Sequence, residues 1–147
     1  MDQAIVQYLK DHHNLYIGEQ MAERIKISLG YALPPEEQQV LKVRGRDLNR
    51  GFPNEIELSS EDMANILNPV LEPILDMIEV TLEQCPPELA NDVMENGVYL
   101  AGGGSCLKGL GAYLSKQVHL PVHSVLDPLQ AVAVGLGKLL SDPDTLA

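Results

Sequence analysis

The most informative part of the sequence is Val98-Tyr99-Leu100-Ala101-Gly102-Gly103-Gly104-Ser105, which continues as Cys106-Leu107-Lys108-Gly109-Leu110. Apolar residues lead into three glycines and a serine, and leucines then recur at helical spacing. This order predicts a buried strand, a glycine turn and the N-terminus of a helix. Such a turn lets a ligand approach the backbone closely. A tight turn that needs glycine only for its backbone angles is an equally good interpretation, and both stay open.

A dinucleotide-binding fingerprint fits this stretch poorly. That motif has the spacing Gly-x-Gly-x-x-Gly, follows the first strand of a βαβ unit and has an acid about 20 residues downstream. Here the glycines come late in the chain, and no acid follows before Asp127. The turn therefore favours contact with a mononucleotide over a dinucleotide.

The composition is that of an ordinary folded chain. Its 147 residues are 45% apolar and 21% charged, which suffices for one core or for two small subdomains that share one. The net charge of −11 argues against a nucleic-acid partner, because phosphate contacts need clustered Lys and Arg.

The sequence contains no clear motif for a membrane span, a signal peptide, a disulfide framework or a metal site. The longest apolar runs fall short of the roughly 18 to 20 residues of a membrane span, and the start Met-Asp-Gln-Ala does not resemble the basic region of a signal peptide. We therefore expect a cytoplasmic protein, without membrane insertion by this chain. Two cysteines do not make a disulfide framework, and neither they nor the four histidines have metal-ligand spacing; these residues are Cys85, Cys106, His12, His13, His119 and His123.

Two amphipathic helices are predicted at the start of the chain. The first spans Asp2 to His13, and the second follows Gly18 and ends at Gly30, in the C′ position typical of glycine. On the second helix Glu23 and Lys26 are three residues apart and project near one another. From spacing alone, a solvated ion pair explains them better than a binding site.

A β-hairpin is predicted next, because apolar and polar residues alternate over 40–44 and 55–58. The connection from Gly45 to Asn54 carries Arg46, Arg50 and the only phenylalanine, Phe52. This tip is either a contact surface or an ordinary long turn.

A long helix should follow the hairpin, capped by Ser59 or Ser60 with Asp62 as the capping-box acid, and end near Cys85. Pro69 and Pro73 lie inside its apolar pattern, so we expect a bend or two shorter segments. A short helix from Glu88 to Glu95 then leads to the glycine stretch.

The last elements are a short strand over 120–125 and a final helix. Asp127 and Pro128 form a typical N-cap and N1 pair for that helix. Gly135 and Gly137 inside it predict close packing against a sheet or another helix, since each costs about 1 kcal/mol relative to Ala. We expect the tail from Ser141 to Ala147 to fray.

The order of several motifs resembles the bacterial actin family of MreB, the rod-shape-determining protein. The resemblance covers nearly the whole chain, and the run starting at Leu82 is very specific. The segments that carry it are Gly18-Glu19, Ala22-Glu23-Arg24-Ile25-Lys26, Val43-Arg44-Gly45-Arg46-Asp47-Leu48, Leu82-Glu83-Gln84-Cys85-Pro86-Pro87-Glu88-Leu89-Ala90, Ala101-Gly102-Gly103-Gly104-Ser105 and Asp127-Pro128-Leu129.

This resemblance implies an α/β protein, the second half of an actin-like (RNase H-like) ATPase fold with a small inserted α+β hairpin subdomain. It implies a sheet-and-helix subdomain over 1–14 and 61–147 and the inserted subdomain over 15–60. It also implies an ATP-binding filament protein of cell shape and wall synthesis at the inner face of the membrane, which self-associates and meets membrane-linked cell-shape proteins. The implied adenosine site consists of Glu23, Arg24, Ile25, Lys26, Gly102, Gly103, Gly104 and Ser105.

The family's first half has no counterpart in this sequence. Its phosphate loops, its catalytic acid and its membrane-binding segments lie there, and so do the groups expected to hold Mg with ATP. We therefore expect no catalytic residue in this chain and no ATP hydrolysis by it alone. Two alternatives remain: the adenosine-binding half of an enzyme like a sugar or acetate kinase, and a free-standing module that docks a partner through the hairpin tip.

Overall fold

The computed structural model of the chain describes residues 1–141. Its helices are α1 (Asp2–His13), α2 (Glu19–Leu29), α3 (Ser60–Glu83), α4 (Pro87–Asn96), α5 (Leu110–Val118) and α6 (Ala131–Ser141). Its strands are β1 (Leu15–Tyr16), β2 (Val40–Asp47), β3 (Pro53–Ser59), β4 (Val98–Leu100) and β5 (Val122–Ser124).

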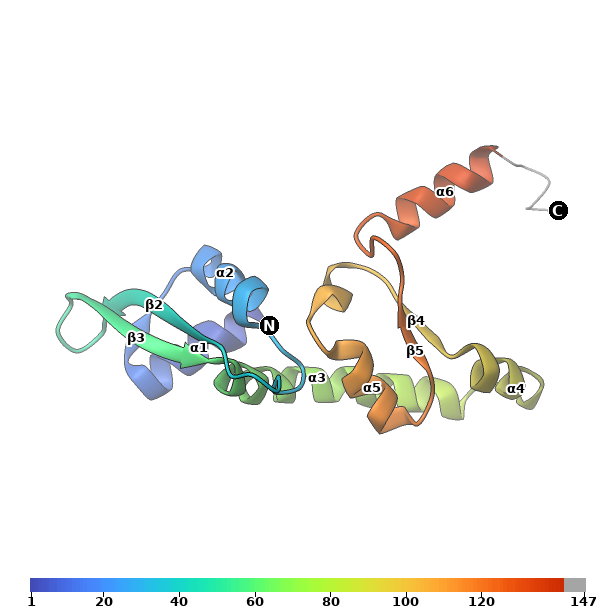
Figure 1. Cartoon of the computed structure of the whole chain (residues 1–147), viewed down its shortest axis with the longest axis horizontal. Helices are drawn as coiled ribbons and strands as arrows, with labels where there is room; N and C mark the ends of the chain where they lie inside the picture. The colour runs from blue at the N-terminus through green and yellow to red at the C-terminus, as the bar shows by residue number, and fades with distance from the viewer. Residues whose placement is uncertain (142–147) are drawn as a thin grey trace.

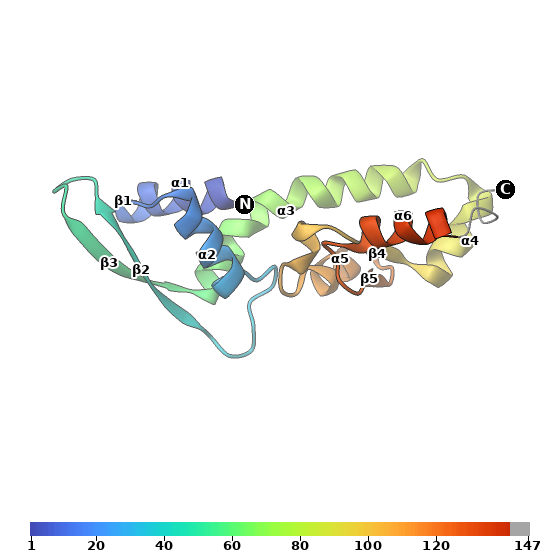
Figure 2. The same ribbon diagram turned by 90° about the horizontal axis from the view of Figure 1, so that it is seen from above.

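Helix α3 is the longest helix of the described residues, and the other elements are arranged along it (Figure 1). The hairpin, α1 and α2 lie at its N-terminal end, and α4, α5, β4 and β5 lie along its C-terminal half, as the second view also shows (Figure 2). The predicted capping box is confirmed: Asp62 N donates to Ser59 Oγ at 3.1 Å, and Ser59 N donates to Asp62 Oδ2 at 2.9 Å.

The two prolines do not divide α3, so of the two predicted outcomes, a bend or two shorter segments, the second is wrong. The helix runs unbroken for 24 residues through Pro69 and Pro73. Both prolines are exposed. They are four residues apart and so lie on one face, where the carbonyl groups left without donors can bind water.

The predicted hairpin is confirmed, with Val43 opposite Ile56 and Arg44 opposite Glu55. The strands reach further than expected, so the connection is only residues 48–52 and not Gly45 to Asn54. The short strand β1 was not predicted; it pairs antiparallel with the end of β2, Leu15 opposite Asp47.

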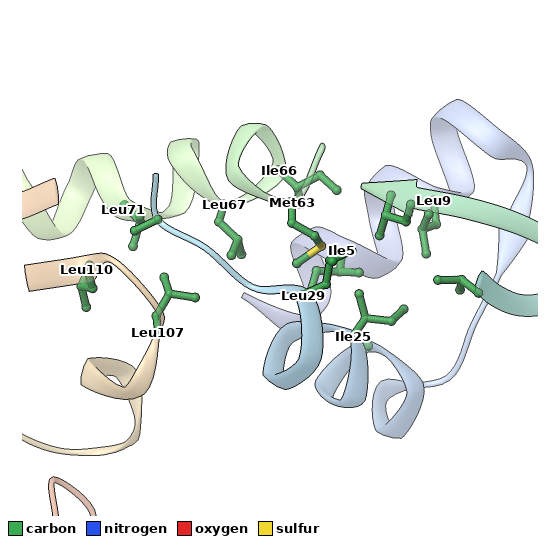
Figure 3. Close-up of a cluster of buried hydrophobic side chains, with 14 of the residues drawn as sticks. Ile5, Leu9, Ile25, Leu29, Met63, Ile66, Leu67, Leu71, Leu107 and Leu110 are labelled. Carbon is green, nitrogen blue, oxygen red and sulfur yellow. The ribbon is translucent and has the colours of Figure 1, made fainter. Parts of the chain in front are cut away.

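One hydrophobic core joins α1, α2, α3 and the start of α5 (Figure 3). Ile5 and Leu9 of α1 pack with Ile25 and Leu29 of α2 against the first half of α3, and the cluster continues to Leu107 and Leu110. Both predicted N-terminal helices are therefore confirmed. Gly30 does end α2, but its backbone is extended (φ −70°) and not in the left-handed C′ conformation.

The second sheet consists of β4 and β5, which run parallel with Tyr99 opposite His123. Both strands were predicted, but β4 is not buried as expected. Tyr99 is 64% exposed. Sheets of two strands cover little of their own surface, which explains the exposure.

The glycine stretch does not open a helix directly. Residues Gly103–Cys106 form their own 3₁₀ turn, and α5 begins only at Leu110 after Gly109, whose φ is +76°. Ser105 does not cap α5; its Oγ donates to Gly102 O at 2.7 Å. The expected apolar face is nevertheless correct, since Leu107, Leu110 and Leu114 are all buried.

The last helix begins later than predicted, and none of its residues is buried by the described part of the chain. Asp127 has φ +52°, which is not an N-cap conformation, and α6 starts at Ala131. Within Ala131–Ser141 no side chain is buried, and a Cβ added at Gly135 or Gly137 would meet no atom within 4 Å. The expected close packing of these glycines is therefore absent from the described part of the chain. The predicted tail lies, beyond Ser141, outside the described residues.

The division into subdomains stays a prediction. In the structure α1 packs against α2, α3 and β1. Residues 1–14 therefore lie beside elements of the 15–60 segment, at the opposite end of α3 from β4 and β5 (Figure 2).

Candidate functional site

A cavity of about 180 Å³ lies between the end of α2 and the glycine turn. One wall comes from the start of the chain and from α2, and the other comes from residues 103–108. The lining residues are Met1, Lys26, Ile27, Gly30, Gly103, Gly104, Cys106, Leu107 and Lys108. Segments far apart in the sequence thus form one mostly apolar hollow with two lysines.

The glycine wall is open because its backbone takes conformations and positions that suit glycine. Gly102 has φ +84°, a value that L side chains rarely adopt, and its N–H donates to Pro128 O at 2.8 Å. A Cβ added at Gly104 would meet no atom within 4 Å. A Cβ added at Gly103 would lie 3.3 Å from Leu129 Cδ2. Both Gly103 and Gly104 line the cavity, so their backbone is accessible to a ligand there.

Lys26 on the opposite wall is bound by Asp2 and not by Glu23. Its Nζ lies 2.8 Å from Asp2 Oδ1 and 3.1 Å from Asp2 Oδ2, and only the contact to Oδ2 has hydrogen-bond geometry. The side chains of Lys26 and Asp2 are 25% and 37% exposed. The ion pair inferred from the three-residue spacing is thus replaced by a contact between α1 and α2.

The other predicted residues of α2 lie outside this cavity. Ile25 is fully buried in the core, and Arg24 is exposed. Glu23 lines a neighbouring, more polar hollow together with Asp2 and Glu19. Met1 lines both hollows, so the two adjoin. The structure therefore brings Lys26, Gly103 and Gly104 into one cavity and places Glu23 beside it.

Lys108 was missed by the sequence reasoning. Its Nζ donates to Ser28 O at 2.9 Å and lies 4.8 Å from the centroid of the Tyr31 ring. Both partners are distant in sequence, so no local spacing could reveal them. Cys106 is exposed on the cavity wall.

A second candidate surface is the hairpin and its tip. Arg44 Nε lies 2.6 Å from Glu55 Oε2, and this contact lowers the pKa of Glu55 and raises that of Arg44. At the tip, Asp47 Oδ1 accepts from the backbone N–H groups of Asn49 and Arg50, and Phe52 is 71% exposed. The tip is therefore an ordered turn that presents an aromatic ring to solvent.

The groups that line the cavity are suited to binding a ligand. The cavity can take a flat apolar group between the lysine stem and the glycine backbone, and hydrogen-bonding groups at its edge. Within residues 1–141, no group of three or more His, Cys, Asp and Glu residues is arranged to hold a metal ion. No helix of the described part is long and apolar enough to cross a bilayer.

Comparison with known proteins gives a consistent match. The model of the family described as MreB/Mbl protein matches residues 1–147. The cell shape-determining protein MreB of Escherichia coli (strain K12) is 42% identical over 139 residues, which cover 95% of this chain and 40% of that protein. The chain thus spans about 40% of the length of this curated relative.

Solved structures of two kinds are similar to the chain. MreB5 of Spiroplasma citri bound to ADP has a TM-score of 0.91 with 32% identity, over 94% of this chain and 42% of that one. The same protein bound to AMPPNP has a TM-score of 0.93 with 30% identity, over 98% and 43%. A MamK double helical filament has a TM-score of 0.71 with 25% identity, over 87% and 39%. These likenesses confirm the predicted fold class.

Proposed function

Because this chain belongs to the MreB/Mbl family, as its motifs predicted, we propose that it is the adenosine-binding and polymer-forming part of an ATP-dependent bacterial actin filament protein. In this proposal the filament organises cell shape and wall synthesis. The observation that carries the nucleotide role is the shared cavity of Lys26, Gly103 and Gly104. The nucleotides bound to the similar MreB5 of S. citri support it.

The proposed roles follow from where each residue lies. The stem of Lys26 covers one face of the base, and the backbone of Gly103 and Gly104 covers the other. Glu23, in the adjoining hollow, accepts hydrogen bonds from ribose hydroxyls. Three of the remaining residues support the two walls, since Ile25 anchors α2 in the core and Gly102 and Ser105 shape the turn. Arg24 is exposed on α2 and has no assigned role in the walls.

The size and charge of the cavity favour the nucleoside end of a nucleotide. Its volume of about 180 Å³ is below the roughly 300–1,000 Å³ typical of sites for whole small ligands, so it suits one ring system. The ammonium of Lys26 is paired with Asp2, and that of Lys108 donates to Ser28 O. Because both ammonium groups already bind protein groups, neither is directed toward the phosphates of a nucleotide. The chain alone should therefore bind nucleotide weakly.

Mg and the phosphates of ATP are not assigned to residues of this chain. The described residues offer no cluster of three metal ligands. Phosphoryl chemistry needs clamped phosphates and a positioned water, so we propose that the chain alone does not hydrolyse ATP.

Self-association is the second proposed role, supported by the likeness to the MamK filament. The ordered hairpin tip with Arg46, Arg50 and Phe52 is the surface we assign to it. Contact with membrane-linked cell-shape proteins, and a location at the inner face of the cell membrane, stay predictions.

The alternatives are less well supported. The matched proteins are cell shape-determining proteins and filaments, which favours a filament protein over a relative of sugar or acetate kinases. A free-standing docking module would use the same hairpin tip, so the experiments on that tip test it as well.

The nucleotide proposal is tested by alkylation of Cys106. This thiol is exposed on the cavity wall, whereas Cys85 lies in another hollow beside Leu82 and α4. At an ADP concentration of about ten times Kd, alkylation of Cys106 should slow about tenfold while that of Cys85 keeps its rate, as followed by peptide mass spectrometry. Lys26→Ala should reduce the protection at the same ADP concentration. Equal rates for Cys106 with and without saturating ADP would reject the site.

A further inference from the structure

Lys108 makes the side-chain contacts that join the two walls of the cavity. It comes from the segment after the glycine turn, yet its Nζ donates to Ser28 O of α2 at 2.9 Å. The same nitrogen lies 4.8 Å from the centroid of the Tyr31 ring, within the range of a cation–π contact. The first contact joins residues 103–108 to the last turn of α2, and the second joins them to Tyr31, two residues after α2 ends.

The backbone beside Lys108 repeats this connection. Ala32 N donates to Lys108 O at 2.8 Å, and Tyr31 and Lys108 form a parallel β-bridge. A Cβ added at Gly30 would clash with Lys26 O of α2 and would lie 3.1 Å from Leu107 Cδ1, so Leu107 packs closely against the backbone at Gly30. The separation of the walls is therefore fixed at residues 30–32 and 107–108.

We propose that Lys108 is a positioning residue that holds the end of α2 against the glycine turn and so sets the width of the nucleotide cavity. This inference rests on the proposed function, because the cavity is the adenosine site in that proposal. Lys108 lines the cavity, but its ammonium is bound to a carbonyl oxygen and an aromatic face, so its effect on a ligand comes through the spacing of the walls.

A purely structural role is the competing explanation. Ser28 O belongs to the last turn of α2, where a cation stabilises the helix end. A residue that only capped the helix would change the melting temperature and leave the affinity for nucleotide alone. The positioning role therefore predicts a change in the affinity for nucleotide, and the purely structural role predicts a change in the melting temperature alone.

Four single variants of the chain and one double variant separate these explanations. Lys108→Ala removes both side-chain contacts, and Lys108→Arg keeps them, because a guanidinium can donate to Ser28 O and stack on Tyr31. Tyr31→Leu removes only the aromatic partner. Lys116→Ala is the matched control, an exposed lysine on α5 outside the cavity.

The measurements are the Kd for ADP, the melting temperature and the exchange rate of the Ala32 amide without nucleotide. We expect Lys108→Ala to raise Kd about 3- to 10-fold and to speed exchange at Ala32, with Lys108→Arg restoring both. Lys116→Ala should match the wild type. Tyr31→Leu should raise Kd by about 2- to 5-fold, and the double variant with Lys108→Ala should bind no worse than Lys108→Ala alone, because both changes remove one shared contact.

Three results would overturn the inference. An unchanged Kd in Lys108→Ala, with ADP still bound and Cys106 still protected, would remove the positioning role and leave the nucleotide site standing. A weaker Kd that Lys108→Arg does not restore would mean that the contacts to Ser28 O and the Tyr31 ring, which both side chains can make, do not set the affinity. Failure of the wild-type chain to bind ADP at all would reject the proposed function and the positioning role with it.

Discussion

At the scale of single residues, the cavity depends on two long-range lysine contacts. Lys26 is paired with Asp2, at the first turn of α1, and Lys108 is bound to Ser28 O. A charged group inside a small cavity is unfavourable unless it has a partner. Because both ammonium groups have partners, the cavity wall is suited to a neutral ring. The two contacts also join α1 to α2 and the segment after the glycine turn to α2.

The pair of Lys26 and Asp2 gives a prediction for binding. Asp2→Asn should weaken nucleotide binding about 2- to 5-fold, because Lys26 then loses the ion pair that orients its stem along the cavity wall and keeps at most a neutral acceptor. The free energy of unfolding should fall by less than about 1 kcal/mol, since the pair is part exposed. Calorimetric titration with ADP and urea unfolding measure the two quantities.

The matched control for this variant is Asp11→Asn on the same helix. Asp11 is exposed and accepts hydrogen bonds only from Gln7 among the described residues. Its replacement should leave the affinity unchanged. If Asp2→Asn binds ADP as tightly as Asp11→Asn does, Asp2 has no part in orienting Lys26.

Sequence motifs identified part of this cavity and missed the rest for a physical reason. Lys26, Gly103 and Gly104 stand in short, recognisable motifs. The partners of the two lysines do not, because Asp2 and Ser28 reach them only through the packing of the core. Local spacing favoured Glu23 as the partner of Lys26, and the α1–α2 contact overrides it.

At the scale of elements, the errors of prediction fall where tertiary context changes a local rule. Pro69 and Pro73 are strong breakers in isolation, yet α3 continues because they face solvent and its other side is packed. Asp127 and Pro128 are good helix starters, but that segment forms a turn whose Pro128 O accepts from Gly102 N. The capping box and the hairpin were predicted correctly because their signals are local.

The hairpin gives a prediction about pH. The Arg44 hydrogen bond lowers the pKa of Glu55, so the stabilisation from this pair is present above the ordinary carboxyl pKa and is lost as the pH falls through the lowered value. In Arg44→Met, the midpoint of Glu55 should move up toward its ordinary value. Side-chain NMR titration of Glu55 in both proteins measures this shift, and identical midpoints would contradict the contact.

The tip of the same hairpin gives a prediction about polymers. Reversing the charges with Arg46→Glu and Arg50→Glu should weaken polymerisation more than nucleotide binding, because neither residue lines the cavity. Sedimentation and ADP titration measure the two effects. Equal loss of both would mean that the tip supports the fold and not the contact.

At the scale of the whole molecule, the structure is well packed around α1, α2 and the first half of α3 and sparse beyond it. The sheet of β4 and β5 has two strands, and α6 presents apolar side chains to solvent, with Leu140 84% exposed. Exposed apolar faces and open strand edges favour association with other chains. The family relatives are more than twice as long as the matched part.

The exposed apolar surface predicts that the 147 residues on their own form dimers or larger species at high concentration. Separately, the proposal that this chain lacks the groups that clamp phosphates predicts no ATP turnover above background. Light scattering with size-exclusion chromatography measures the first property, and phosphate release measures the second. A clean monomer at high concentration would mean that the exposed faces do not drive association, and measurable turnover would place catalytic groups within the chain.

The central claim is that nucleotide binds between Lys26 and the glycine turn, and a crystal structure of the full chain with ADP tests it most directly. The account predicts the adenine ring in the cavity, with the Lys26 stem on one face, the backbone of Gly103 and Gly104 on the other, and Glu23 beside the ribose. ADP bound at another surface, with this cavity empty, would contradict it.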